Sequence, residues 1–303
     1  MADVATVRER GQASRTLIPK GWGGPLLVSP MAFWMVAFFL VPLFLILLYG
    51  FGRLPGPYSS GVRLGFDLEW YKQIFSGADY HKAFLLTAQM VITNTLGCLI
   101  LGYPLAYFIS RKTGKRKTVF VLLVMLPFWT SFLIRTYAWM TILGNGGLLN
   151  TFLLKLHLIG SNTPMNIMFT NKAVIAGLIY DYLPFMVLPL FVSIEKIDRS
   201  LFEASKDLGA GKWVTFWRVT LPLSLPGIFA GSMLVAIPTT GEFVIPAILG
   251  GGKVVLWGWL IEESFMGMGG GNWALGSALS NVLLVVMLVV VALYLKAVGS
   301  EEF

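Results

Sequence analysis

Three ionisable residues, Arg135, Asp181 and Glu242, stand inside long apolar stretches of this 303-residue chain. A charged side chain is costly inside a bilayer, and where it occurs it usually serves a function. At about 1.5 Å of helix rise per residue, all three lie within about 8 Å of the middle of a membrane. We therefore expect them to share one polar cavity on the path of a transported substrate, where the two carboxylates would attract a cationic cargo.

Aromatic residues border both carboxylates. Tyr180 and Tyr182 flank Asp181, and Phe243 follows Glu242. Carboxylates beside aromatic rings suit a flexible organic polycation, which they would bind through charge and cation–π contacts. The two tyrosines point to different sides of a helix, so at most one of them faces the cavity. An alternative stays open, in which the arginine only neutralises a carboxylate and the aromatic rings are ordinary packing.

The helix that would carry Glu242 is predicted to break. Two prolines and two threonines stand with a glycine inside the nine residues 238–246, and proline and glycine interrupt helices. A broken helix at membrane depth is tolerated where it lines a cavity. This pattern favours the interpretation of Glu242 as a residue on a transport path.

The composition is that of an integral membrane protein. Hydrophobic residues make up 56% of the chain and charged residues only 13%, against about 25% in an ordinary soluble domain. The single cysteine, Cys98, excludes an internal disulfide, and His81 and His157 have no ligand-spaced neighbours, so we expect no metal site. No glycine-rich phosphate loop precedes a Lys-Ser or Lys-Thr pair. We expect no cofactor in this chain, and any nucleotide that drives it must be bound by another chain.

Six apolar stretches are long enough to cross a bilayer. They cover residues 30–51, 84–109, 119–143, 173–194, 225–249 and 275–296, and a short amphipathic helix is predicted over 67–75. Six spans place both termini on one side, which carries fifteen Lys and Arg against seven on the other. Because positive residues favour the cytoplasm, the termini are predicted to be cytoplasmic. The predicted organisation is a tail over 1–29, a membrane domain over 30–298 and a tail over 299–303. The net charge of +8 then reflects topology and contact with the bilayer, not binding of nucleic acid.

A polar hairpin within residues 195–222 separates the fourth and fifth spans. Ser200 and Glu203 fit a capping box, which predicts that a helix begins there. Gly209 stands where a left-handed helix end is expected. A second short helix is predicted over 212–219, and Pro222 is predicted to end it.

This hairpin resembles the signature of permeases in binding-protein-dependent, ATP-driven importers. The signature reads Glu-Ala-Ala, three residues, Gly, nine residues, Ile-x-Leu-Pro. Here it stands as Glu203-Ala204-Ser205, then Gly209, then Val219-Thr-Leu-Pro222, with serine and valine as conservative departures. Residues 131–139, 182–189 and 231–251 further resemble the permeases of putrescine/spermidine importers.

The resemblance implies an all-α membrane protein with the six-helix, type I (MetI-like) importer permease fold in a bacterial cytoplasmic (inner) membrane. Its implied partners are a second homologous permease subunit, a dimer of ATPase subunits that binds ATP and Mg, and a periplasmic solute-binding protein. This chain would then perform no catalysis and would switch access between the two sides as the ATPases close.

In that family the first hairpin helix docks on the ATPase. The resemblance assigns this contact to Glu203, Ala204, Ser205, Leu208 and Gly209, with Leu201 and Phe202 adding apolar area. The small residues would let the partner approach closely, and the glycine allows a sharp exit. The alternative for Glu203 is that it only caps its own helix.

Other functions are left open by the residues alone. The same machine could carry a different solute, such as ferric ion, sulfate or an opine. An ion-coupled secondary transporter would leave the hairpin unexplained, and its usual internal repeat is not evident. A membrane enzyme lacks a visible nucleophile–base pair or ligand cluster.

Overall fold

A computed structural model describes residues 23–53, 62–158, 160, 165–267 and 271–299. The described chain is helical, and its only β pairing is an isolated bridge between Arg53 and Arg63. The chain divides into two units, Met1–Leu48 and Tyr49–Phe303, which are described separately below. The predicted tails fall almost wholly outside the described residues, so the predicted domain boundaries stay predictions.

The first unit holds one apolar span. Helix α1 (Gly23–Met35), a π-helical turn η1 (Val36–Leu40) and α2 (Val41–Tyr49) follow without a break, and Val28–Tyr49 is long and apolar enough to cross a membrane. In the π turn, the Val41 N–H donates to the carbonyl of Val36, five residues back. The wider turn makes room for the ring of Pro42, which would otherwise clash with the preceding turn. The first predicted span is confirmed.

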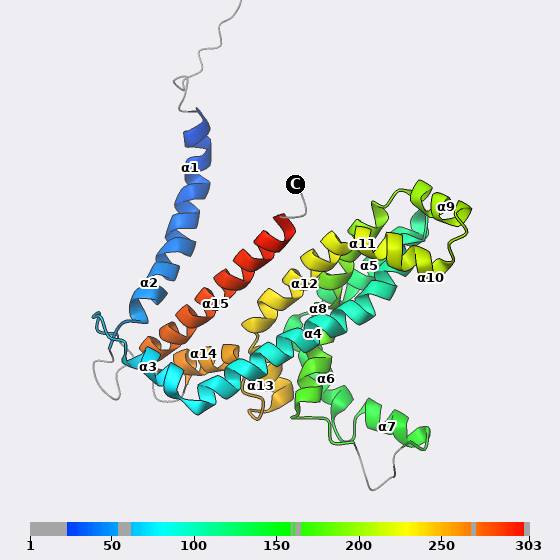
Figure 1. Ribbon diagram of the computed structural model, residues 1–303. Helices are drawn as coiled ribbons and strands as arrows, with labels where there is room; N and C mark the ends of the chain where they lie inside the picture. The colour runs from blue at the N-terminus through cyan, green and yellow to red at the C-terminus, as the bar shows by residue number, and fades with distance from the viewer. Residues whose placement is uncertain (1–22, 54–61, 159, 161–164, 268–270, 300–303) are drawn as a thin grey trace, which may run out of the picture. The chain divides into compact units, whose positions relative to one another are not determined.

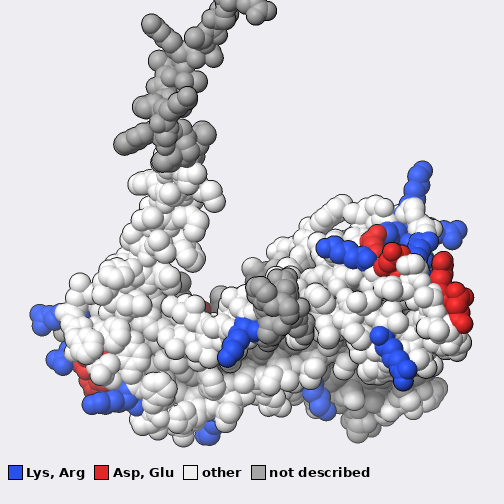
Figure 2. Space-filling view, turned by 45° about the horizontal axis from the view of Figure 1, so that its top comes forward, with Lys and Arg blue, Asp and Glu red and all other residues white. Residues whose placement is uncertain are grey.

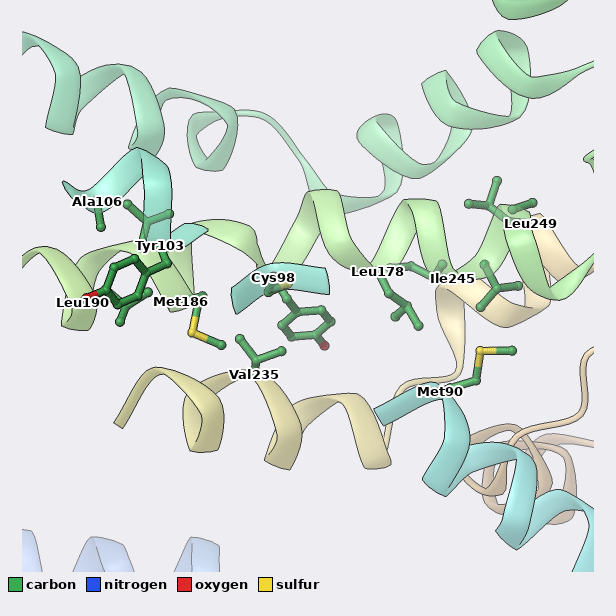
Figure 3. Packing of buried hydrophobic residues seen from close by; sticks show 14 of the residues in the cluster. Met90, Cys98, Tyr103, Ala106, Leu178, Met186, Leu190, Val235, Ile245 and Leu249 are labelled. Atoms are coloured by element: carbon green, nitrogen blue, oxygen red, sulfur yellow. The ribbon is translucent and has the colours of Figure 1, made fainter. Parts of the chain in front are cut away.

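Three long helices form the centre of the second unit. Helices α4 (Ala78–Ser110), α8 (Asn171–Glu195) and α12 (Leu225–Thr240) run side by side and pack on one another (Figure 1). Their buried side chains interdigitate in the core, where Cys98, Met186 and Val235 come from three different helices (Figure 3). At one end, α15 (Trp273–Gly299) packs against α14 (Trp257–Met266) and α3 (Glu69–Ser76), which confirms the predicted amphipathic helix.

Glycines let α12 approach α8 closely. Gly227 and Gly231 are one turn apart on α12, in the small-xxx-small spacing of close helix pairs in membranes. A Cβ atom at Gly231 would lie 2.8 Å from Met186 Sδ and 3.2 Å from the Met186 carbonyl oxygen. At Gly227 it would lie 2.8 Å from the Pro189 carbonyl oxygen. Any side chain at these positions must therefore push the two helices apart.

Gly231→Val should destabilise the protein by about 1–3 kcal/mol, the usual cost of overpacking a tight core. The matched control is Gly146→Val, because a Cβ at Gly146 would meet nothing within 4 Å. The measurement is the melting temperature of the detergent-solubilised chain. Equal melting temperatures for the two variants would contradict the close packing.

The third predicted span is not one straight helix. It is divided into α5 (Lys115–Met125), a 3-10 turn η2 (Leu126–Trp129) and α6 (Phe132–Leu143), followed by α7 (Leu148–Lys155). The halves on either side of the turn meet at 90°. Pro127 has no N–H to continue the helix, and Thr130 and Ser131 adopt extended backbone conformations. The span predicted over 119–143 is therefore present as a bent pair of helices, and the bend itself was not predicted.

The fifth span breaks where the sequence predicted. Helix α12 ends at Thr240, Gly241 follows, and the short helix α13 (Val244–Gly250) begins after Phe243. A second bend of 61° separates α12 from the hairpin that precedes it. Four helices of the described chain can cross a membrane unbroken, and two bent pairs bring the number to six. The structure is thus consistent with the six-span architecture.

Candidate functional site

The first helix of the polar hairpin is capped two residues earlier than predicted. Helix α9 (Arg199–Asp207) is capped by Asp198, whose carboxylate accepts a hydrogen bond of 2.9 Å from the Ser200 N–H. This bond holds the pKa of Asp198 below its ordinary value. The capping box predicted at Ser200 and Glu203 was wrong, because an aspartate already satisfies the first orphan N–H. The cap therefore does not require the Glu203 carboxylate, which is exposed.

The hairpin presents most of the predicted coupling residues on its outside. Glu203, Ala204, Leu208 and Gly209 are exposed, Leu208 to 88%. Gly209 has φ +75°, the left-handed conformation predicted for the end of the helix. Ser205, in contrast, is buried, and its hydroxyl lies 2.7 Å from that of Thr215 across the turn. The serine therefore holds the two arms of the hairpin together, and its small size helps the hairpin's own packing.

The second arm continues through Pro222. Helix α10 (Lys212–Thr215), a π turn η3 (Phe216–Thr220) and α11 (Leu221–Leu223) follow one another, and the Leu221 N–H donates to the Phe216 carbonyl. The π turn accommodates the proline ring as it does in the first span, and the arm ends at Leu223, one residue beyond the end predicted at Pro222.

A clamp joins the hairpin to the loop between α4 and α5. The Arg111 guanidinium lies 4.7 Å from the ring centroid of Tyr107 and 4.4 Å from that of Phe202, and it donates to the Tyr107 hydroxyl at 2.6 Å. Lys117 pairs with Glu195 beside them. Phe202 therefore packs on the chain's own loop. A cavity of about 490 Å³ is bordered by Arg111, Phe202, Lys117 and Glu195, and charged side chains gather over this end of the second unit (Figure 2).

A second site lies in the middle of the helices, where α6, α8 and α13 pack together. Arg135 Nε lies 3.3 Å from Asp181 Oδ1, and the two side chains are only 10% and 4% exposed. The guanidinium also donates from Nη1 to the Pro127 carbonyl at 3.2 Å. Its Cζ lies 5.0 Å from the ring centroid of Phe128 and 6.0 Å from that of Phe132.

The two buried carboxylates differ in their hydrogen bonds. Within the described chain, neither oxygen of Asp181 accepts a hydrogen bond, and Arg135 Nε donates none. Glu242 accepts three: from the Tyr182 hydroxyl at 2.9 Å, and from the backbone N–H groups of Val244 and Ile245 at 3.0 and 3.3 Å. Glu242 therefore caps α13 and ties it to α8, whereas Asp181 keeps its capacity to accept.

The structure brings four of the six predicted path residues together: Arg135, Asp181, Tyr182 and Glu242. Tyr180 turns away, as expected for one of the two tyrosines, and packs edge-on against Trp139 with the centroids 5.5 Å apart. Phe243 is 40% exposed at the break between α12 and α13.

Sequence reasoning missed the groups that hold the arginine. These are the Pro127 carbonyl and the rings of Phe128 and Phe132, which come from the unpredicted turn η2 and the start of α6. The only available signal was Pro127 itself, a helix-breaking residue within an apolar stretch.

The charges of this site do not balance. The site holds two carboxylates and one guanidinium: Arg135 pairs with Asp181, and Glu242 accepts a hydrogen bond from Tyr182, the residue that follows Asp181. With both carboxylates ionised, the cluster keeps one negative charge in a region with little water. Such a site attracts a cation and repels an anion.

Comparison with known proteins agrees with this architecture. Residues 19–298 match the family model of the binding-protein-dependent transport system inner membrane component. The chain is 40% identical over 266 residues to the spermidine/putrescine transport system permease protein PotB of Escherichia coli (strain K12), covering 87% of this chain and 94% of that protein. PotB of Haemophilus influenzae is 39% identical, covering 87% and 90%.

Solved structures show the same fold. A bacterial ABC transporter involved in the import of the acidic polysaccharide alginate superposes with a TM-score of 0.72 at 18% identity, covering 92% of this chain and 95% of that one. That transporter's complex with a periplasmic protein bound to an alginate pentasaccharide gives a TM-score of 0.71 at 18% identity, covering 91% of this chain and 93% of that one. The chain belongs to the family of binding-protein-dependent transport system inner membrane components and is a multi-pass permease subunit of an ABC importer.

Proposed function

We propose that this chain carries polyamines such as putrescine and spermidine across the bacterial cytoplasmic membrane, as one permease subunit of the importer. The observation that carries the proposal is the buried cluster of two carboxylates and one guanidinium beside aromatic rings. Its residual negative charge suits a cargo with several ammonium groups, and the adjacent rings add cation–π contacts. The names of the relatives that match most of the chain support the same cargo.

The charge of the cluster also weighs against the alternative solutes. Sulfate would meet the unneutralised carboxylate and be repelled. Ferric ion prefers several oxygen or nitrogen ligands, and no group of three or more metal-ligating residues occurs among the residues that the structure describes. An opine carries carboxylates of its own and would meet the same repulsion.

The proposal includes the partners that such a machine needs. A second homologous permease would complete the membrane part, two ATPase subunits would bind ATP and Mg, and a periplasmic binding protein would deliver the cargo. The exposed face of α9 supports docking of an ATPase, because Glu203, Ala204 and Leu208 extend from a hairpin clamped at its base. Closure of the ATPases would move this hairpin and rock the helices between two access states.

Purification and uptake together test the proposed function. The tagged chain, expressed with the genes next to its own, should bring down a second permease and an ATPase from membranes. Proteoliposomes that hold this complex and its binding protein should take up labelled spermidine or putrescine only when ATP is supplied. An excess of unlabelled polyamine should suppress this uptake, whereas an excess of sulfate should not. ATP-dependent uptake that sulfate suppresses and polyamine does not would contradict the proposed cargo.

Arg111→Ala should weaken the coupling of ATP hydrolysis to transport. The substitution removes the cation–π contact with Phe202 on α9 and the contacts that hold the guanidinium on Tyr107 of α4, so the first hairpin helix is held less firmly to the end of α4. At about 0.5–2 kcal/mol for such contacts, we expect transport per ATP hydrolysed to fall by about two- to thirtyfold. Arg116→Ala, an exposed position in the same basic stretch, is the matched control and should behave as wild type. If Arg111→Ala transported as much cargo per ATP hydrolysed as wild type, the proposed role of the clamp would be contradicted.

A further inference from the structure

The buried cluster already contains a bound cation, which is the chain's own. The Arg135 guanidinium faces the Asp181 carboxylate at 3.3 Å and the ring of Phe128 at 5.0 Å. A carboxylate and an aromatic face are the two elements that would hold an ammonium group of a polyamine. Arg135 therefore occupies the place that a cargo cation would need.

The pair is poorly optimised for a permanent structural contact. A buried ion pair offsets its desolvation only when good geometry and further hydrogen bonds satisfy the remaining oxygens. Here, within the described chain, both Asp181 oxygens and Arg135 Nε lack hydrogen bonds, although the Asp181 side chain is only 4% exposed. An ammonium group with three N–H donors could supply these missing hydrogen bonds, so cargo would gain contacts at Asp181 that Arg135 does not make.

Arg135 is also attached to the bend of its own span. It lies in the first turn of α6, after the break, and its Nη1 donates to the Pro127 carbonyl before the break. The two halves of this span meet at 90°. The same side chain thus contacts the carboxylate on α8 and the turn that sets the bend.

We propose that Arg135 is a resident counter-ion, which occupies Asp181 when the path is empty and is displaced when an ammonium group of the cargo binds. This inference rests on the proposed function, since it takes a polyamine as the cargo. Without cargo, the arginine keeps the carboxylate neutralised and the path closed to smaller cations. With cargo, the released arginine is held by the Pro127 carbonyl and the ring of Phe132.

Displacement predicts that removing Arg135 makes cargo bind more tightly. Wild-type protein must break its own ion pair before it binds cargo, which lowers its apparent affinity. The probe is spermidine, added to the purified permease–ATPase complex in nanodiscs without binding protein. The readout is the midpoint, which is the spermidine concentration that gives half of the maximal rise in melting temperature. In Arg135→Gln this concentration should be at least about tenfold lower than in wild type. 1,4-Butanediol, an uncharged analogue of putrescine, should have no effect.

Two further variants separate displacement from a structural role. Arg135→Gln/Asp181→Asn removes both charges, so it should fold as well as wild type, but spermidine should not raise its melting temperature. Arg135→Lys keeps a charge but loses the planar fork that spans two partners, so its midpoint should lie between wild type and Arg135→Gln. It provides the decisive measurement if Arg135→Gln does not fold.

The outcomes separate the inference from the function it rests on. If wild-type proteoliposomes import spermidine and the arginine variants keep the wild-type midpoint, the displacement is wrong and the proposed function stands. The displacement would also be wrong if spermidine raised the melting temperature of the double variant as much as that of wild type. If wild-type proteoliposomes import no polyamine and the melting temperature of no variant responds to spermidine, the proposed function fails and the displacement fails with it.

Discussion

Glu203→Arg should abolish most polyamine uptake while the membrane helices remain folded. The carboxylate is exposed on α9, and Asp198 caps the helix in its place, so the hairpin does not need Glu203 for its own structure. If α9 docks on an ATPase as proposed, the substitution places a positive charge against a surface that fits the negative charge of Glu203. Reversal of a docking charge costs several kcal/mol, which corresponds to a fall in uptake of at least about tenfold.

The measurement is ATP-dependent spermidine uptake in proteoliposomes, with co-purification of the ATPase as a second readout. Glu69→Arg makes the same charge change at an exposed position on α3, away from the hairpin in Figure 1, and should leave both readouts unchanged. An unchanged melting temperature for Glu203→Arg would show that the fold is intact. Wild-type uptake in this variant would show that Glu203 takes no part in docking.

The hairpin shows how far local sequence rules reach. Its position, its two arms and the left-handed Gly209 were predictable, because a glycine between two short helical segments has few other conformations. The cap at Asp198 was missed, since Asp198 and Ser200 are both good capping residues and only the folded chain decides between them. The inward position of Ser205 depends on Thr215 across the turn, which is a tertiary contact that no local pattern encodes.

The membrane spans also have features that local sequence rules predict and one that they do not. Hydropathy located all six, and the cluster of prolines and glycine at 238–246 predicted the break before α13. The 90° bend after η2 was missed because a single proline in an apolar helix can be accommodated by a wider turn, as Pro42 and Pro222 are here. At Pro127 the chain bends instead, and the Arg135 side chain bonds across the bend.

The sequence placed two carboxylates near one another but could not show how each is used. Their hydrogen bonds separate them: Asp181 accepts none within the described chain, and Glu242 accepts three. We therefore expect Asp181 to meet the cargo and Glu242 to hold α13 in place while adding its charge to the site. Loss of the Glu242 side chain should therefore first lower the stability of the fold.

Glu242→Leu should lower the free energy of unfolding by about 2–5 kcal/mol, because it leaves the N–H groups of Val244 and Ile245 and the Tyr182 hydroxyl without their acceptor. The melting temperature of the purified complex measures this loss, and uptake should fall with it. Tyr182→Phe is the matched control: it removes only one donor, so it should cost about 1 kcal/mol.

Glu242→Gln then decides between a structural role and direct contact with the cargo. Glutamine keeps one acceptor oxygen for the backbone N–H groups and loses the charge. If Glu242 mainly holds α13, this variant should keep at least about half of the wild-type uptake, since a weakened but formed set of hydrogen bonds costs well under the 1.4 kcal/mol that corresponds to a tenfold change. A variant that melts like wild type but imports no spermidine would contradict this assignment. Glu242 would then be a cargo carboxylate in its own right, and the three hydrogen bonds it makes here would have to break during each transport cycle.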